Sequence, residues 1–190
     1  MQLSRAWQPG LLGWAKAAAQ AIAEIRALAG WLLGEGCPAV ALWGTSYGGW
    51  LAGLTACGDQ RLAPIVLTAP GARTNLSMAK LILRRGVREA MQRQRKAYEE
   101  LNLTPWNLTS ARPAVPKENI LLIEGLHDLI CPKAATECVW QTWEKPDIWR
   151  FPHGHVGVCC GGVPGLTGHV LRWLSARLNA PAIRTAKSSG

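Results

Sequence analysis

Apolar residues between Leu11 and Leu33 recur every three or four positions, as they do on one face of an amphipathic helix. Gly34 and Gly36 follow directly and favour a helix end at this point. Further helical patterns cover residues 47–57, 132–143 and 166–178. Each of these four patterns predicts a helix.

Four predicted strands alternate with these helical patterns, and most of them are short apolar runs bounded by Gly, Pro or polar residues. Three of the predicted strands are such runs, at residues 39–43, 64–68 and 119–124, and the fourth is predicted at 147–151, where Asp147 and Arg150 accompany the apolar residues. Continuous apolar runs of this length are typical of strands that are buried on both faces of a parallel sheet. Strands that alternate with helices predict an α/β fold, with a mostly parallel sheet flanked by helices on both faces.

The longest stretch without a predicted strand lies between the second and third apolar runs, at about residues 72–117. It carries a basic helical pattern at roughly 77–101, followed by a return that is rich in proline. We expect this stretch to be an insertion into a single domain that spans residues 1–184. Residues 185–190 are polar and are expected to form a disordered tail.

The formal net charge is +9, and much of it comes from Lys and Arg residues between Arg73 and Lys96. A basic cluster of this kind can bind nucleic acid, anionic lipid or an acidic substrate. Acidic residues such as Glu89 and Glu99 interleave with the cluster, and no nucleic-acid motif accompanies it. We therefore favour a solvated helix face and expect no nucleic-acid partner.

The N-terminal region predicts neither a signal peptide nor a membrane span, because Lys16, Glu24 and Arg26 interrupt its apolar run. The chain has six cysteines but no CxxC pair, which favours reduced and mostly buried thiols. Together these features predict a cytoplasmic protein without a transmembrane segment.

The segment Gly44-Thr45-Ser46-Tyr47-Gly48 lies where a predicted strand ends and a predicted helix begins. Between a strand and a helix, the pattern Gly-x-Ser-x-Gly describes a nucleophile elbow, which is a tight and strained turn. Such a turn raises the Ser46 hydroxyl above the sheet and places the Tyr47 N–H at a helix N-terminus, where it can donate to an oxyanion. Ser46 is therefore the candidate nucleophile, and Tyr47 is the candidate oxyanion-hole donor.

A serine hydroxyl is nearly inert at neutral pH, so it needs a histidine base and a carboxylate that orients the base. Asp128 follows the third predicted strand, and His155 follows the fourth. Because ligands bind at the carboxyl ends of parallel strands, we expect these side chains to meet Ser46 at one edge of the sheet. Asp128 is the candidate orienting acid, and His155 is the candidate base.

These residues resemble the α/β-hydrolase superfamily. The resemblance rests on the turn around Ser46, on Gly125-x-x-Asp128 after the next-to-last strand and on Gly154-His155 after the last strand. It implies an α/β-hydrolase fold and a serine esterase or lipase-like activity, in which Ser46 attacks an acyl carbonyl and His155 transfers the proton. The implied substrate is a small-molecule ester or a lipid-like ester, and the resemblance implies no cofactor.

Two alternatives involve the residues that follow the last predicted strand. His153 lies two residues before His155 and is a second candidate base, although Gly154-His155 fits the superfamily pattern better. His153, His155, Cys159 and Cys160 also suggest a zinc site, since imidazole and thiolate are good zinc ligands. Adjacent cysteines are awkward ligands for one ion and no CxxC is present, so we predict no metal site.

Compared with that superfamily, the chain lacks N-terminal strands. About 43 residues precede Gly44, and they predict one helix and one strand where the superfamily has several strands. We therefore expect an N-terminally truncated fold, an oxyanion hole that keeps only the Tyr47 donor, and an exposed sheet edge. Exposed edges favour pairing with another chain, which predicts self-association.

The resemblance also implies that the insertion at about 72–117 forms a helical cap over the active site. Trp106 in this insertion is a candidate wall of the substrate pocket, with helix packing as the alternative role. A rival function stays open as well. In it, the chain is a catalytically impaired remnant of the fold that binds a ligand or partner through its basic cap helix.

Overall fold

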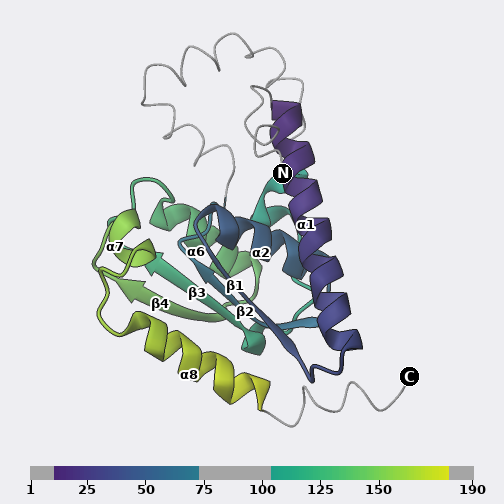
Figure 1. Ribbon diagram of the computed structural model, residues 1–190. Helices are drawn as coiled ribbons and strands as arrows, with labels where there is room; N and C mark the ends of the chain where they lie inside the picture. The colour runs from purple at the N-terminus through teal and green to yellow at the C-terminus, as the bar shows by residue number, and fades with distance from the viewer. Residues whose placement is uncertain (1–10, 73–103, 180–190) are drawn as a thin grey trace.

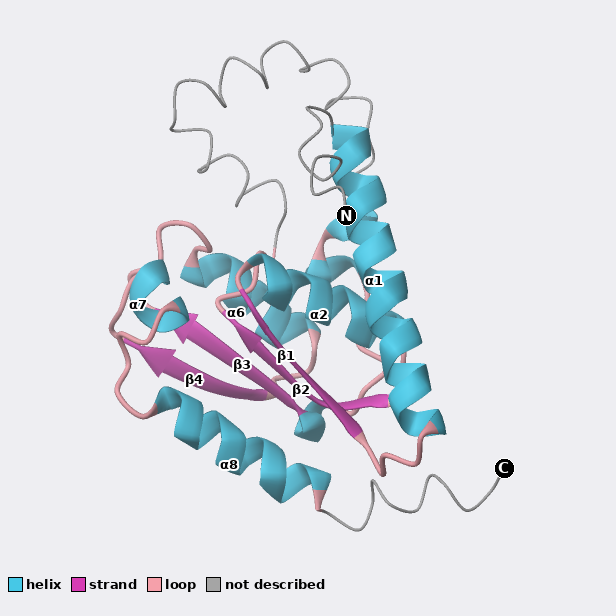
Figure 2. Cartoon of the chain, viewed as in Figure 1, coloured by secondary structure: helices cyan, strands magenta, loops and turns pink. Residues whose placement is uncertain are grey.

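The computed structural model describes residues 11–72 and 104–179, which form a parallel sheet with helices on both faces (Figure 1, Figure 2). The strands are β1 (Val40–Thr45), β2 (Leu62–Thr68), β3 (Ile120–Gly125) and β4 (Asp147–Phe151). They lie side by side in chain order, and each neighbouring pair is parallel. The predicted α/β class and the four predicted strands are confirmed.

Four of the helices coincide with the predicted ones to within one residue at each end. They are α1 (Leu11–Gly34), α2 (Tyr47–Gly58), α6 (Lys133–Thr142) and α8 (Leu166–Leu178). The sequence patterns did not indicate the short helix α7 (His155–Cys159) or the 3-10 turns η1 (Thr104–Trp106), η2 (Leu108–Ser110) and η3 (Lys117–Asn119). Within the described ranges, no helix has both the length and the apolar character needed to cross a membrane.

Parts of several predictions lie outside the described residues. The basic helical pattern at 77–101 and the tail at 185–190 are among them. Of the insertion expected at 72–117, the structure describes residue 72 and residues 104–117, which contain the three 3-10 turns.

The side chains of β3 alternate between two layers of the core. Ile120 and Leu122 pack in the layer that includes α2 and α6, whereas Leu121 and Ile123 pack in the layer that includes α8. Figure 1 shows the same arrangement, with α8 on one face of the sheet and α2 on the other. All four side chains are fully buried, so β3 is covered on both faces, as its continuous apolar run predicted.

Strands β1 and β4 form the two edges of the described sheet. Trp43 of β1, which we expected in the core, is only half-buried, and its indole N–H donates to Thr68 Oγ1 at 3.0 Å. Trp50 and Trp173, which were also expected in the core, are buried. Self-association through an exposed sheet edge stays a prediction.

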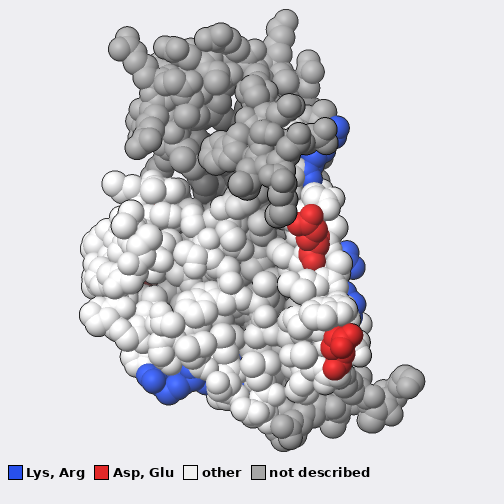
Figure 3. Space-filling model, in the orientation of Figure 1, with Lys and Arg blue, Asp and Glu red and all other residues white. Residues whose placement is uncertain are grey.

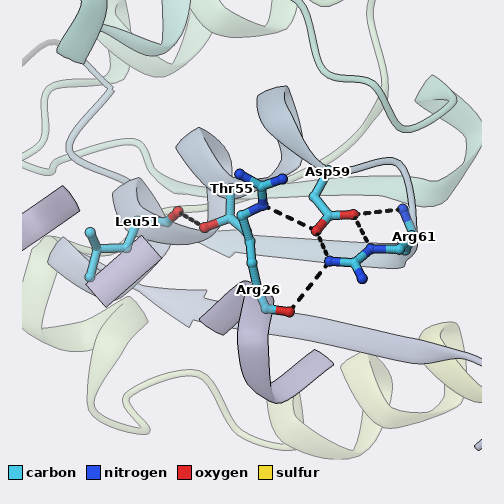
Figure 4. A network of polar contacts seen from close by, with 5 residues as sticks. All are labelled: Arg26, Leu51, Thr55, Asp59 and Arg61. Carbon is cyan, nitrogen blue, oxygen red and sulfur yellow. Dashed lines mark hydrogen bonds and ion pairs between the residues drawn. The ribbon is translucent and has the colours of Figure 1, made fainter. Parts of the chain in front are cut away.

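A cluster of ion pairs joins α1 to the turn that follows α2 (Figure 4). The Asp59 carboxylate is 4% exposed and accepts hydrogen bonds from Arg61 Nη2 at 2.5 Å and from Arg26 Nε at 3.2 Å. Arg61 Nη2 also donates to the carbonyl of Arg26 at 3.4 Å. Hydrogen bonds from Arg61, and then from Arg26, hold the pKa of Asp59 well below its usual range although burial opposes them.

Charged side chains are unevenly distributed over the face of the molecule that Figure 3 shows. They gather along α1 and beside α8, whereas the surface over α7 and the neighbouring strand ends is largely uncharged. On this face, the surface near the carboxyl ends of β3 and β4, where parallel strands present their functional side chains, is therefore mostly uncharged.

Candidate active site

Ser46 lies in the turn between β1 and α2, in a backbone conformation that few non-glycine residues adopt. Its φ is 55° and its ψ is −116°. The Ser46 N–H donates to the carbonyl of Thr68 at 2.8 Å, and the Ser46 carbonyl accepts from the N–H of Trp50 at 3.0 Å. Such conformations cost ~1–3 kcal/mol and persist only where the surroundings fix them. Here strand β2 and helix α2 fix the turn on its two sides.

The two glycines of the Gly-x-Ser-x-Gly pattern have different roles. A Cβ at Gly44 would overlap the carbonyl oxygen of Gly48, because the end of β1 runs very close to the start of α2. A Cβ at Gly48 would meet no atom within 4 Å. The first glycine is therefore required by packing, whereas the second is not.

Ser46, His155 and Asp128 form one chain of hydrogen bonds. Ser46 Oγ lies 2.9 Å from His155 Nε2, and His155 Nδ1 lies 2.7 Å from Asp128 Oδ2. Ser46 and His155 are 109 positions apart in the sequence. They meet because β1, β3 and β4 are parallel and end at the same edge of the sheet. The structure thus brings together the three side chains that the sequence analysis selected.

The carboxylate of Asp128 has partners for both of its oxygens. Oδ1 accepts the backbone N–H groups of Ile130 at 2.8 Å and Cys131 at 2.7 Å, while Oδ2 faces His155. The side chain is 1% exposed. Because the turn after β3 fixes the carboxylate, the carboxylate in turn fixes the orientation of the imidazole ring.

The surroundings of His155 favour its protonated form. The pKa of His155 is raised well above its ordinary value by the hydrogen bond with Asp128 and then by hydrogen bonds with the thiols of Cys131 and Cys159, although burial opposes these effects. The neutral imidazole is therefore a stronger base than that of a free histidine, but it exists only at a higher pH, after His155 has lost its proton.

His153, the alternative base, does not join this chain of hydrogen bonds. Its Nδ1 is buried and has no hydrogen-bond partner among the described residues. Its ring packs so closely on Gly157 that a Cβ at that position would lie 3.1 Å from ring atoms. Of the two candidate bases, His155 is the one that contacts Ser46 and Asp128.

Tyr47 is the first residue of α2, so its N–H belongs to the first helical turn, where N–H groups have no acceptor within the helix. The Tyr47 ring lies 5.3 Å from the ring of Trp50, which lies 5.9 Å from the ring of Trp106. Trp50 Nε1 also donates to the carbonyl of Trp106 at 2.7 Å. Trp106 therefore packs against α2 through Trp50, and its place in a substrate pocket stays a prediction.

Five large apolar side chains are exposed next to the three residues of the hydrogen-bond chain. They are Tyr47, Leu126, Leu129, Ile130 and Val156, and we call them the apolar rim. Each lies one or two positions from Ser46, Asp128 or His155 in the sequence. The most exposed are Leu129 at 74% and Val156 at 67%. Exposed apolar side chains close in sequence to a polar cluster are consistent with a binding surface.

The described chain also has a pocket of about 370 Å³ at the C-terminal end of α6. It is lined by residues 112–118 and 142–144, and Arg112 and Glu144 of this lining form an ion pair. Its lining includes none of Ser46, Asp128 and His155. We therefore place no part of the candidate active site in it.

The burial of the cysteines differs from the prediction. All six are free, as expected, but only Cys131 is buried, while Cys138 and Cys160 are exposed. The expectation of mostly buried thiols was therefore wrong. No sequence pattern indicated the contacts that the Cys131 and Cys159 thiols make with His155. The one available signal was proximity in sequence, since Cys131 follows Asp128 by three positions and Cys159 follows His155 by four.

No protein-family profile matches the chain. The uncharacterized protein Rv2627c of Mycobacterium tuberculosis strain H37Rv is 32% identical over 146 residues, which cover 73% of this chain. The chain spans about a third of the length of that relative, at 34%.

Solved structures resemble the chain at low sequence identity. The esterase PF2001 of Pyrococcus furiosus matches with a TM-score of 0.63 and 15% identity, over 83% of this chain and 62% of that one. The α/β hydrolase GrgF of Penicillium sp. sh18 matches with a TM-score of 0.56 and 14% identity, over 85% of this chain and 72% of that one. With its parallel sheet and its Ser46 turn between β1 and α2, the chain therefore has the α/β-hydrolase fold.

Proposed function

We propose that the chain is a serine hydrolase that cleaves carboxylic esters through an acyl-enzyme on Ser46. The observation that carries this proposal is the pair of contacts that His155 makes, at 2.9 Å to Ser46 Oγ and at 2.7 Å to Asp128 Oδ2. A base placed between a hydroxyl and a buried carboxylate is the arrangement that activates a serine nucleophile.

In the first half of the reaction, His155 Nε2 takes the proton of Ser46 Oγ as the oxygen attacks the ester carbonyl. The new C–O bond gives a tetrahedral intermediate with a negatively charged oxygen, toward which the Tyr47 N–H donates. The intermediate then collapses. The bond to the alcohol breaks, and His155 returns its proton to the departing alkoxide, which leaves an acyl group on Ser46.

In the second half, His155 removes a proton from water as the water oxygen attacks the acyl carbon. The bond between the acyl carbon and Ser46 Oγ then breaks, and His155 returns the proton to Ser46. The products are a carboxylic acid and the original enzyme. Throughout both halves, Asp128 keeps the Nδ1 proton directed at itself and leaves Nε2 free to accept a proton.

The apolar rim supports an ester whose acyl or alcohol group is apolar. Leu129 and Val156 directly follow Asp128 and His155 in the sequence, and their side chains are mostly exposed. Burying an apolar group against them contributes roughly 25 cal/mol per Å² of apolar surface removed from water. The esterase PF2001 of Pyrococcus furiosus, which shares the fold, is an enzyme of the same proposed reaction class.

Labelling with a fluorophosphonate tests this proposal, because such a reagent forms a stable bond only with an activated serine. The full chain is compared with Ser46→Ala and with the matched control Ser175→Ala, which removes an exposed hydroxyl on α8. We expect the wild-type chain and the Ser175→Ala variant to label at Ser46, as located by mass spectrometry, and the Ser46→Ala variant not to label.

Hydrolysis of p-nitrophenyl esters of increasing acyl length then tests the preference for apolar groups. A folded wild-type chain that neither labels nor hydrolyses any of these esters would refute the proposal. Labelling that persists in the Ser46→Ala variant would refute the assignment of the nucleophile.

A further inference from the structure

The thiol of Cys131 lies beside the contact between Asp128 and His155. One ligand atom from each of these three residues lies within 4.8 Å of the other two. Cys131 and Asp128 are each 5% exposed, and the His155 side chain is 12% exposed. The mechanism above uses the carboxylate and the imidazole but gives the thiol no role.

The turn after β3 places the thiol there. Asp128 Oδ1 accepts the N–H groups of Ile130 and Cys131, so the chain folds back on the carboxylate within three residues. The same two hydrogen bonds hold Asp128 with Oδ2 directed at His155 Nδ1. Backbone donors that fix a carboxylate in this way act as an outer shell, which orients a potential metal ligand.

The three ligand atoms suit a zinc ion. Zinc binds thiolate sulfur at about 2.3 Å and imidazole nitrogen or carboxylate oxygen at about 2.0–2.2 Å, so its ligand atoms are roughly 3.5 Å apart in a tetrahedral site. Asp128 Oδ2 and His155 Nδ1, which lie 2.7 Å apart, therefore need to separate by less than about 1 Å, and the sulfur, within 4.8 Å of its partners, needs to approach them by roughly 1.3 Å at most. A thiolate and a carboxylate together balance the charge of a dication. The sulfur favours zinc and cadmium over magnesium and calcium.

We infer that Asp128, Cys131 and His155 form an inhibitory binding site for a soft divalent metal ion. The site differs from the zinc site considered in the sequence analysis, with which it shares only His155. The binding itself requires no catalytic activity, whereas its inhibitory effect rests on the proposed function. Zinc is the natural occupant to test, and cadmium is its spectroscopic probe.

Metal binding would disable the base by moving a proton. The thiol proton of Cys131 leaves to solvent as the sulfur binds the metal. Protonated His155 loses its Nδ1 proton to solvent as Nδ1 binds the metal with its lone pair, and the proton that remains on the imidazole is held at Nε2. Nε2 then donates to Ser46 Oγ and can no longer accept its proton. No electron is transferred, and when a chelator removes the metal, the thiol and Nδ1 take up protons from solvent again.

Cadmium binding tests the site without any need for activity. The full-length Ser46→Ala variant, kept reduced, is titrated with Cd²⁺, and the ultraviolet band of the cadmium–thiolate bond is recorded. Cys131→Ser removes the sulfur and keeps the size of the side chain, and Cys138→Ser is the matched control, because Cys138 is exposed on α6. We expect the band in Ser46→Ala and in its Cys138→Ser derivative. In the Cys131→Ser derivative we expect affinity to fall by roughly 100-fold or more, since losing even an outer-shell partner costs 10–100-fold.

The inhibitory effect is tested on the wild-type chain with Ser46 intact. We expect Zn²⁺, but not Mg²⁺, to slow fluorophosphonate labelling of Ser46, and we expect EDTA to restore it. In Cys131→Ser, labelling should be insensitive to Zn²⁺. Circular dichroism, and Cys131→Ala as a second variant, establish that the fold is kept.

Three results would overturn the inference. They are the absence of a cadmium band in the Ser46→Ala variant, a band that survives in its Cys131→Ser derivative, and zinc bound at this site without any effect on labelling. If the metal-free chain never labels, the proposed function fails, and the cadmium band alone then decides whether the metal site exists.

Discussion

Two buried aspartates of this chain have nearly the same burial but different partners. Asp128 is 5% exposed and Asp59 is 4% exposed, and in each of them both oxygens accept hydrogen bonds. Asp59 binds the guanidinium groups of Arg26 and Arg61, which stay charged at every accessible pH. Asp128 binds backbone N–H groups and the imidazole of His155, whose charge can change.

Because their partners differ, Asp59 is suited to a structural role and Asp128 to a role in proton transfer. The ion pairs of Asp59 end at the two arginines and tie α1 to the turn after α2. The hydrogen bond of Asp128 continues through His155 to the hydroxyl of Ser46, which lies in a strained turn at the edge of the sheet. Of the two carboxylates, only that of Asp128 has a side-chain partner that can give and take a proton, as the proposed reaction requires.

The substitution Asp128→Asn should have the largest effect on activity. The amide can still accept the N–H groups of Ile130 and Cys131, but its NH₂ group faces Nδ1 and favours the imidazole tautomer with the proton on Nε2. His155 then cannot take the proton of Ser46. We expect kcat/KM for a p-nitrophenyl ester to fall by ~10⁴-fold, with little change in the thermal unfolding temperature.

Asp59→Asn provides the comparison for that measurement, because it makes the same chemical change at an aspartate of equal burial. Its kcat/KM should stay within about twofold of the wild-type value, since the side chain has no contact with the hydrogen-bond chain of Ser46 and electrostatic effects at a distance are screened. An equal loss of activity in both variants would mean that the loss reflects general destabilisation and not the role of Asp128.

The hydrogen bond between Asp128 and His155 should also affect the pKa of His155, although by a smaller factor than it affects kcat/KM. Asp128 is the main cause that raises this pKa, so His155 stays protonated to a higher pH than a free histidine, whose pKa is about 6.5. The rate of acylation should therefore rise with pH as the imidazole loses its proton. In Asp128→Asn we expect the pKa to fall by at least about one unit toward the ordinary value.

Proton NMR titration of the imidazole measures this pKa without any need for activity, in the Ser46→Ala background with and without Asp128→Asn. The chain has only four histidines, and a His155→Gln variant identifies the relevant signal. The resonance of His169 on α8 serves as an internal control. An unchanged His155 titration would show that Asp128 does not set the charge of the base.

The sequence predicted the elements of the fold closely because their signals are local. The periodicity of α8 and the apolar run of β3 each depend on a few consecutive residues, and both elements appear where they were expected. Ser46, Asp128 and His155 could also be selected, because each follows a predicted strand and parallel strands end at one edge. What the sequence could not give was the set of contacts around them.

The exposure of the cysteines and the choice between His153 and His155 depend on how side chains pack in three dimensions. His153 and His155 lie two positions apart, yet one packs against Gly157 while the other bonds with Ser46 and Asp128. The contact between Cys131 and His155 joins residues from the ends of two different strands. No periodic pattern records such a contact, since it arises only after the sheet has formed.

Asp59→Asn should have the smallest effect on activity, so its effect on stability tests the structural role of Asp59. The side chains of Arg26 and Arg61 are 49% and 46% exposed, so solvent screens part of their attraction to Asp59. We therefore expect the free energy of unfolding to fall by about 1–2 kcal/mol at pH 7. Asp147→Asn is the matched control. The Asp147 side chain is 50% exposed, so this substitution should lower the free energy of unfolding by less than Asp59→Asn does.

The pH dependence of that loss separates the ion pairs of Asp59 from simple packing. Because the pKa of Asp59 is lowered in the folded chain, its contribution to stability is complete above the pKa of an unfolded aspartate, near 3.9. The contribution disappears as the pH falls through the lower, folded pKa. Urea unfolding should therefore give a constant difference between wild type and Asp59→Asn above about pH 5, and a difference that narrows below about pH 4. A difference that stays the same down to strongly acidic pH would assign the stabilisation to packing, because packing does not depend on the charge that Asp59 carries.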